Sequence, residues 1–429
     1  MKILIKNAHI IDPFLKIEID KTSILVENGK ILKISNTIDE TPDYTIEEDN
    51  LVFPAFIDMH THLREPGFEY KEDIESGTLA GIHGGFTTIT AFPNTNPILD
   101  SVDKIQLVKE RIEKKAKIRV LPIASITKNQ EGKELVDFKL LKDHVYGFTD
   151  DGKGIQDFNI ARKAMIEAKK YNILLMLHEE DERFGKGVVN YGYLSKKLGL
   201  EGIKSEAEES MIARDIVLAK ETGARIHFCH ISTKLGAKLI KIGKEEGLNI
   251  TAEVTPHHLC FDETTFEDFV PNMKMSPPLR TREDRLFLID AFKNGIIDCI
   301  ATDHAPHADH EKKDIKTASF GITGLETAFV IIYNYLVKKG YLNLYDTIKG
   351  LTVNPAKTLG LEPNPIKEGN FANFVIFNKK EKTLINDEFF FSRSKNFPLR
   401  GELEGKITYL FYNKKFFKFI NNTIEEVEF

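Results

Sequence analysis

Two histidines stand one residue apart at the end of an apolar run. The stretch from Phe53 to Leu63 reads FPAFIDMHTHL and contains His60 and His62. Alternate side chains of a strand face the same way, so both imidazoles are expected to project together from the strand's carboxyl end. Two imidazoles in that position can hold one metal ion. A pair of surface histidines is the alternative, and the apolar character of the run weakens it.

Further residues of the metal-ligand type follow later apolar runs. They are Asp150 with Asp151, His178, His230, and the group Asp303, His304 and His307. Four neutral imidazoles and two carboxylates suit a pair of divalent ions of the zinc type, with one carboxylate bridging the two. Two such ions, roughly 3.5–4 Å apart, generate a shared hydroxide nucleophile while one of them polarises a carbonyl oxygen. The residue types therefore point to hydrolysis of an amide or a similar bond.

Eight short apolar runs alternate with amphipathic helical stretches in the middle of the chain. This alternation is typical of a parallel sheet with crossover helices, and eight units predict an α/β fold with a closed (β/α)8 TIM-like barrel. Barrel enzymes carry their chemistry at the carboxyl ends of the strands, where the candidate ligands fall. The expected strands are Ala55 to His60, Thr87 to Phe92, Ile118 to Ala124, Val145 to Thr149, Ile173 to His178, Arg225 to His230, Asn249 to Val254 and Asp298 to Thr302.

Both ends of the chain have an all-β texture. Short alternating pieces separated by turn signals such as Asn28-Gly29 fill the first fifty residues, and similar pieces return after Leu359. Because chain ends often lie close together, one small β-sandwich built from both termini is the economical interpretation. The expected domains are 1–52 and 360–429 for the two parts of the sandwich and 53–359 for the metal-dependent barrel.

Composition and charge are those of an ordinary globular protein. The 429 residues are 41% hydrophobic and 29% charged, with a net charge of −6, and they carry no basic excess that would indicate nucleic-acid binding. No apolar segment approaches the roughly 20 residues of a membrane span, and the first residues lack a signal-peptide layout, so a cytoplasmic location is expected. Cys229, Cys260 and Cys299 have no metal-type spacing and are predicted to be buried packing residues.

Taken together, the motifs resemble the amidohydrolase superfamily and, within it, the class I dihydroorotases. The resemblance covers nearly the whole chain and includes FIDMHTHLREPG, GGFTTITAFPNTNP, YGFTDDGKGIQ, LLMLHEE, HFCHIST, KMSPPLR, IATDHAPH and SFGITGLETAF. It implies two Zn²⁺ ions per subunit, one held by His60, His62 and Asp303 and the other by His178 and His230. Asp151 would bridge them, in preference to Asp150, because the family pattern places its ligand second in that pair. Asp303 would also act as the general base and acid.

The resemblance also implies a set of substrate contacts. Arg64, Asn94 and His307 would reach a carboxylate of the substrate, since arginine supplies a forked donor that matches it. The set further includes His62, the backbone at Phe320 and Gly321, and Ser276, where the family usually has asparagine. That change would shorten a substrate hydrogen bond or route it through water. The alternatives are that Asn94 is only a turn residue and His307 a solvated loop histidine.

The activity implied is dihydroorotase: reversible hydrolysis of the cyclic amide of (S)-dihydroorotate to N-carbamoyl-L-aspartate in pyrimidine synthesis. Allantoinases and hydantoinases are the nearest alternative, but they bridge their metals with a carboxylated lysine, and Gly147 to Gly152 contains none. A non-catalytic partner of aspartate transcarbamoylase is another alternative, which the presence of all six ligands disfavours. The resemblance leaves open a catalytic partnership with that enzyme and favours a homo-oligomer.

The remaining histidines are expected to have no direct role in the chemistry. His257 and His258 follow the seventh expected strand and match a family element that does not bind metal, so a structural role is expected. His227 lies three residues before His230 and therefore on the other face of its strand, with no partner expected. His83 is interpreted as an ordinary surface or core residue.

Overall fold

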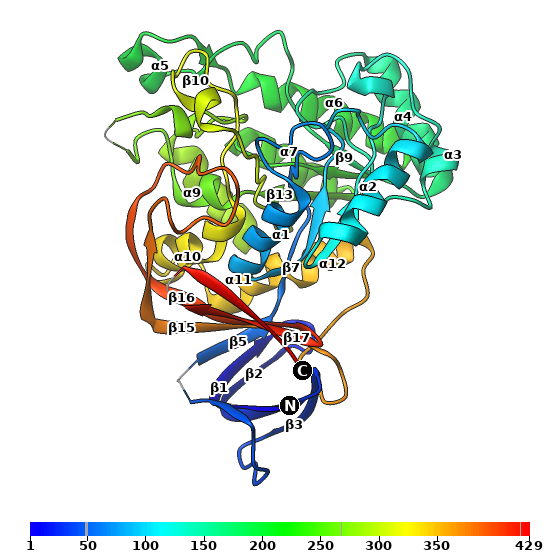
Figure 1. Ribbon diagram of the computed structural model, residues 1–429. Helices are drawn as coiled ribbons and strands as arrows, with labels where there is room; N and C mark the ends of the chain where they lie inside the picture. Colours follow the sequence, from blue (N-terminus) through cyan, green and yellow to red (C-terminus); the bar gives the residue numbers. More distant parts are fainter. Residues whose placement is uncertain (48–49, 267, 421) are drawn as a thin grey trace.

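The computed structural model describes residues 1–47, 50–266, 268–420 and 422–429. Its central part is an α/β arrangement of short parallel strands wrapped by helices, and a large sheet that contains both chain ends lies beneath it (Figure 1). Among the described residues, no helix combines the length and apolar character needed to cross a membrane.

The central strands form two parallel sheets, and they follow seven of the eight expected runs. One sheet has the order β6-β7-β8 and the other β14-β13-β12-β9. Their bounds are β6 Phe56–Asp58, β7 Phe86–Ala91, β8 Arg119–Pro122, β9 Leu174–Leu177, β12 Arg225–Phe228, β13 Ile250–Val254 and β14 Cys299–Ile300. Since they are parallel, their carboxyl ends point to one face of the molecule.

The prediction of a regular fourth strand from Val145 to Thr149 is wrong. Phe148 alone pairs there, through isolated parallel bridges to Ala124 and Leu175. The reason is that the backbone of this run divides its hydrogen bonds between two neighbours: Thr149 N–H donates to Ala124 and Phe148 N–H to Leu174. The run therefore lies between the ends of β8 and β9. A further isolated bridge, between Thr61 and His304, joins the chain beyond β6 to the chain beyond β14.

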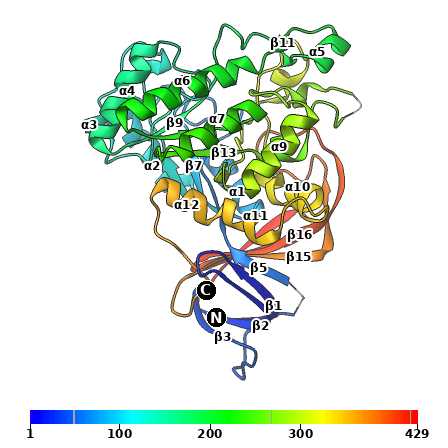
Figure 2. The ribbon, with the colours of Figure 1, turned by 180° about the vertical axis from the view of Figure 1, so that it is seen from behind.

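Helices cover the outside of these strands (Figure 2). Several begin at a polar cap: Asp73 accepts from the Ser76 N–H at the start of α1, and Thr281 accepts from the Asp284 N–H at the start of α9. Small buried residues such as Ala161, Ala164 and Ala168 let α4 pack closely. The bounds are α1 Ile74–His83, α2 Val102–Lys115, α3 Phe138–Leu141, α4 Phe158–Tyr171, α5 Tyr193–Leu198, α6 Glu206–Thr222, α7 Lys234–Glu245, α8 Pro256–Cys260, α9 Arg282–Lys293, α10 Ala328–Ile332, α11 Leu344–Leu351 and α12 Val353–Leu359.

The two ends of the chain build one sheet together, as the sequence predicted. The predicted sandwich is corrected in one respect, since the nine strands seen in the described part of the chain form a single hydrogen-bonded sheet and not two separate ones. The junction is β5, which pairs with β1 on one side and antiparallel with β15 on the other. The strands are β1 Lys2–Asp12, β2 Ile17–Glu27, β3 Lys30–Ser35, β4 Tyr44–Ile46, β5 Asn50–Pro54, β15 Ala372–Ile385, β16 Gly401–Asn413, β17 Lys415–Ile420 and β18 Thr423–Glu428.

A hydrophobic cluster holds the two halves of this sheet together. It combines Ile3, Ile5 and Ile24 from the beginning of the chain with Phe374 and Phe411 from the end, each of them fully buried. Each such side chain contributes about 1.5–3 kcal/mol when removed from water. The halves are therefore held by burial as well as by strand pairing. Cys229, Cys260 and Cys299 are free thiols buried elsewhere in the core, as predicted.

Candidate metal centre

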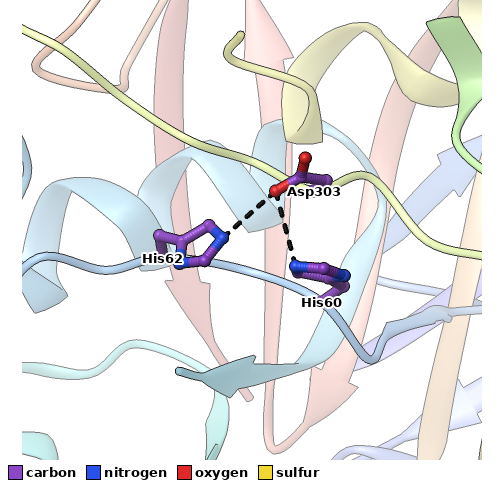
Figure 3. Close-up of side chains that lie close together, drawn as sticks. All are labelled: His60, His62 and Asp303. Carbon is purple, nitrogen blue, oxygen red and sulfur yellow. Dashed lines mark hydrogen bonds and ion pairs between the residues drawn. The ribbon is translucent and has the colours of Figure 1, made fainter. Parts of the chain in front are cut away.

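Two histidines and an aspartate meet where β6 and β14 end (Figure 3). Nε2 of His62 lies 3.1 Å from Oδ1 of Asp303, and Nε2 of His60 lies 3.4 Å from the same oxygen. The alternation of side chains beyond β6 brings both imidazoles to one side, as the sequence predicted. All three residues are buried.

A second group lies beside the first. Nδ1 of His178 and Nε2 of His230 are 2.9 Å apart, and they lie 3.2 and 3.3 Å from Oδ1 of Asp151. The two histidines follow β9 and β12, which are neighbours in their sheet. Each group brings its ligand atoms within 4.8 Å of one another, the spacing expected of residues that share an ion.

Asp151 lies between the two groups. Its Oδ2 is 3.3 Å from Nε2 of His62, while its Oδ1 faces His178 and His230 and lies 3.5 Å from Nε2 of His60. Asp150 is directed elsewhere, because its carboxylate accepts the backbone N–H groups of Ile126 and Thr127. The structure thus brings Asp151, and not Asp150, to the position that a bridging ligand requires.

The protonation pattern of the cluster fits cation binding. Burial raises the pKa of Asp151, but His60, His178 and His230 outweigh it and hold that pKa well below the usual value. Burial alone lowers the pKa of His60, whereas Asp151, Glu253 and Asp303 raise it well above normal. Both shifts mean that positive charge is favoured between the imidazoles and the carboxylates.

His60 provides the most specific test of whether these residues fit a metal. Its Nδ1 is hydrogen-bonded to Glu253, and its buried Nε2 has no hydrogen-bond partner among the described residues. If Nδ1 carries the proton, the lone pair of Nε2 faces carboxylate oxygens at 3.4 and 3.5 Å. Acceptors at that distance repel unless a cation lies between them. That cation is either a proton on Nε2, which the raised pKa of His60 favours, or a metal ion in its place, so the residues present fit a bound metal ion.

Glu253 is a residue that the sequence reasoning missed. It lies on β13, is fully buried, and its Oε1 is 2.5 Å from Nδ1 of His60. Its Oε2 lies 3.0 Å from Nε2 of His227, which corrects the expectation that His227 has no partner. The backbone N–H of His230 also donates to Oε1. A carboxylate behind a ligand histidine fixes its tautomer and orientation.

The candidate substrate residues line a cavity of 350 Å³ next to the cluster. Nδ1 of His62 is hydrogen-bonded to Oδ1 of Asn94 at 2.9 Å, so Asn94 is more than a turn residue. Nε of Arg64 donates to the Pro306 carbonyl. The expected set lies together, since the cavity is lined by His62, Arg64, Asn94, Ser276, His307, Phe320 and Gly321 as well as by Asp151, His178, His230 and Asp303.

His307 is buried, which corrects the alternative of a solvated loop histidine. Burial, with Arg64 and Lys71 nearby, lowers the pKa of His307 to about 2, so the ring is neutral at physiological pH. Its Nε2 donates to the Phe320 carbonyl at 2.8 Å. The neutral ring thereby connects the chain after β14 to the Phe320 backbone.

Ser276, expected to contact the substrate, lines the cavity and also has a hydrogen-bond partner within the protein. Its hydroxyl donates to Oε2 of Glu180 at 2.8 Å, and the same oxygen lies 3.1 Å from Nε2 of His178. Glu180 is the second residue missed, although it stands only two positions after His178 in LLMLHEE. Ser276 therefore supports the orientation of His178 through Glu180.

Comparison with solved structures places the fold. An L-hydantoinase (dihydropyrimidinase) from Arthrobacter aurescens matches with a TM-score of 0.83 at 23% identity, covering 98% of this chain and 95% of that one. A D-hydantoinase matches with a TM-score of 0.84 at 23% identity, covering 99% and 97%. These likenesses show that the chain shares the fold of the hydantoinases.

Proteins found by sequence comparison are more similar to this chain than these structures are. A dihydroorotase from Bacillus cytotoxicus is 46% identical, over 89% of this chain and 90% of its own length. Dihydroorotases from Caldanaerobacter subterraneus and Aquifex aeolicus are each 43% identical; the first match covers 100% of both chains, and the second covers 95% of this chain and 97% of the relative. A family model described as dihydro-orotase-like matches residues 49–236. The chain belongs to the dihydroorotase family.

Proposed function

We propose that this chain is a dihydroorotase, which hydrolyses the cyclic amide of (S)-dihydroorotate to N-carbamoyl-L-aspartate and closes the ring in the reverse direction. The observation that carries the proposal is the position of Asp151 between two groups of ligand-type residues, next to a cavity that contains Arg64. A native carboxylate at the bridging position, where hydantoinases use a carboxylated lysine, favours this activity over theirs.

We propose that the cluster holds two Zn²⁺ ions. His60, His62 and Asp303 would hold one, His178 and His230 the other, and Asp151 both. Neutral imidazole and carboxylate are the ligands that Zn²⁺ prefers. Two such ions supply a hydroxide nucleophile at neutral pH and polarise the carbonyl of the scissile amide.

Asp303 is the proposed general base and acid. Burial raises its pKa, but His60 and His62 lower it more, so its carboxylate is ionised and can accept a proton. It lines the cavity, and a single group can therefore take the proton of the nucleophile and deliver it to the leaving amide nitrogen.

Arg64 is the proposed anchor of the substrate carboxylate, with Asn94 and His307 beside it. Burial lowers the pKa of Arg64 to about 10, so the guanidinium remains a cation at physiological pH. The ion pairs found among the described residues do not include Arg64, whose guanidinium contacts the Pro306 carbonyl and His307. Donors of the guanidinium fork thus remain for a bidentate anion.

The finer architecture is also proposed. We infer that the bridges at Phe148 and between Thr61 and His304 close the strands into a (β/α)8 barrel, with domain boundaries at 1–52, 53–359 and 360–429. We further expect a cytoplasmic homo-oligomer. Comparing activity of the purified chain with and without aspartate transcarbamoylase tests whether that enzyme is a required partner.

Turnover of four substrates by the purified zinc-loaded protein tests the proposed activity. (S)-Dihydroorotate is expected to be hydrolysed, whereas dihydrouracil, hydantoin and allantoin, which lack its carboxylate, are expected to react poorly. Faster turnover of hydantoin or allantoin would assign the chain to that activity instead. No turnover in the presence or absence of aspartate transcarbamoylase would support the non-catalytic alternative.

A further inference from the structure

The chain from His304 to Ile322 forms one wall of the candidate substrate cavity. His304 pairs with Thr61 and with Ile322 through parallel bridges, so both ends of this segment are attached beside the metal cluster. Between them lie His307 and the Phe320–Gly321 backbone, which line the cavity. The shape of this segment therefore determines where its polar groups meet a bound molecule.

A buried lysine stands behind this wall. The Lys312 side chain is almost completely buried, and its Nζ donates to the carbonyls of Lys274, Ser319 and Gly321 at 3.0, 2.8 and 2.9 Å. An ammonium group has three donors, so all of them are used. The ion pairs found among the described residues do not include Lys312.

The three carbonyls belong to the two segments that enclose the cavity on this side. Ser319 and Gly321 flank Phe320, while Lys274 lies two residues before Ser276, which lines the cavity. The Gly321 N–H donates to the Lys274 carbonyl at 3.0 Å. Lys312 thus fastens both sides of Phe320 and holds them to the neighbouring segment.

The backbone at Gly321 lies so close to its neighbours that no side chain would fit there. Its φ is +145°, and an added Cβ would lie 2.7 Å from the Ala305 carbonyl oxygen and 2.9 Å from Cδ2 of His307. The backbone is therefore in close contact with the chain just after β14. Asn396, from the connection between β15 and β16, adds a second tie: its Nδ2 donates to the carbonyls of Ala305 and Gly321.

Burying the Lys312 ammonium without a carboxylate partner lowers the stability of the fold. Burial and the nearby Lys274 lower the pKa of Lys312 to about 7, which shows that the charged form is disfavoured here. An apolar side chain would avoid that cost but would leave three buried carbonyls without donors. The side chain is thus suited to arranging these particular carbonyls.

We propose that Lys312 is a positioning residue, which sets the orientation of the Phe320–Gly321 backbone along the substrate cavity without touching the substrate itself. Lys312 does not line the cavity, so it acts only through the segments that it connects. The kinetic part of this inference rests on the proposed dihydroorotase function, and the structural part does not.

The test compares Lys312→Met with Lys313→Met, which removes a neighbouring exposed lysine. Hydrogen–deuterium exchange in peptides covering residues 318–323 is expected to accelerate at least about tenfold in Lys312→Met and to be unchanged in Lys313→Met. For dihydroorotate, KM is expected to rise about tenfold or more with a smaller change in kcat, because an uncharged contact is mispositioned while the cluster remains. Zinc content is expected to equal that of the wild type.

Wild-type exchange together with wild-type KM in Lys312→Met would overturn the proposal. A uniform acceleration of exchange over the whole chain would also overturn it, since it would mean that Lys312 serves only global stability. If Lys312→Met does not fold, Lys312→Gln, which keeps two N–H donors, is expected to show the same local change in weaker form. If the wild type does not act on dihydroorotate, the proposed function fails while the exchange comparison still decides the role of Lys312.

Discussion

Replacing Glu253 by glutamine removes a charge from behind the metal cluster while preserving shape. Glu253 contacts Nδ1 of His60 at 2.5 Å and Nε2 of His227 at 3.0 Å, and it has no solvent exposure to compensate for a lost partner. The amide can still accept one hydrogen bond, but it no longer stabilises the orientation of His60 through charge. Loss of such a supporting partner typically weakens metal binding about 10–100-fold, or about 1.4–2.8 kcal/mol.

Competition of the purified protein with a chromophoric zinc chelator measures this change. Glu326→Gln is the matched control, because Glu326 is also a buried carboxylate paired with a histidine, His83, away from the cluster. Zinc affinity is expected to fall in Glu253→Gln and to stay at the wild-type value in Glu326→Gln. Equal affinities in the two variants would refute the idea that Glu253 orients His60 for metal binding.

Three further predictions concern the substrate anchor, the proton carrier and a buried histidine. Arg64→Lys is expected to raise KM for dihydroorotate about tenfold or more, because lysine keeps the charge but not the forked donor; an unchanged KM would argue against Arg64 as the anchor. Asp303→Asn is expected to lower kcat at least about 100-fold, measured with zinc at saturation, and near wild-type turnover would exclude it as the proton carrier. Burial lowers the pKa of His258 from 6.5 to about 3, so its contribution to stability is complete above pH 6.5 and is lost as the pH falls toward 3. Denaturant titrations measure the free energy of unfolding at each pH. Between pH 6.5 and 3 this free energy is expected to fall less steeply in His258→Gln than in the wild type, by up to about 1.4 kcal/mol per pH unit. The same pH dependence in both proteins would contradict the low pKa of His258.

The meeting of the ligand-type residues could be predicted because it follows from local rules. Parallel strands in such a fold end on one face, so residues that end separate apolar runs are expected to converge there. His60, His178 and His230 end three different runs and lie together in the structure. The pairing of the two chain ends in one sheet could also be predicted, because short strand-like segments occur on both sides of the central runs.

Other features depend on contacts that a linear pattern does not contain. Glu253 lies inside a buried strand, and only its position as a lone charge in the apolar stretch ITAEV signals a role. Lys312 binds three backbone carbonyls, which have no sequence signature at all. Ser276 lines the cavity and also donates to Glu180, a partner that the sequence could not indicate because tertiary packing decides it.

The irregular fourth strand has a similar explanation. The run from Val145 to Thr149 has the apolar character of a strand, but its hydrogen bonds go to two neighbours in turn and leave pairing only at Phe148. Hydrophobic pattern predicts burial well, whereas the extent of pairing depends on how far the flanking strands reach. The sequence therefore indicated the place of the run correctly and its regularity incorrectly.

The most direct test of the two-ion cluster is zinc stoichiometry in three proteins: the wild type, Asp151→Ala and His178→Ala. Because Asp151 lies between both groups of ligand-type residues, we expect about two tightly bound zinc ions in the wild type, about one in His178→Ala and almost none in Asp151→Ala. Retention of two tightly bound ions by Asp151→Ala would contradict the central claim that this carboxylate holds both.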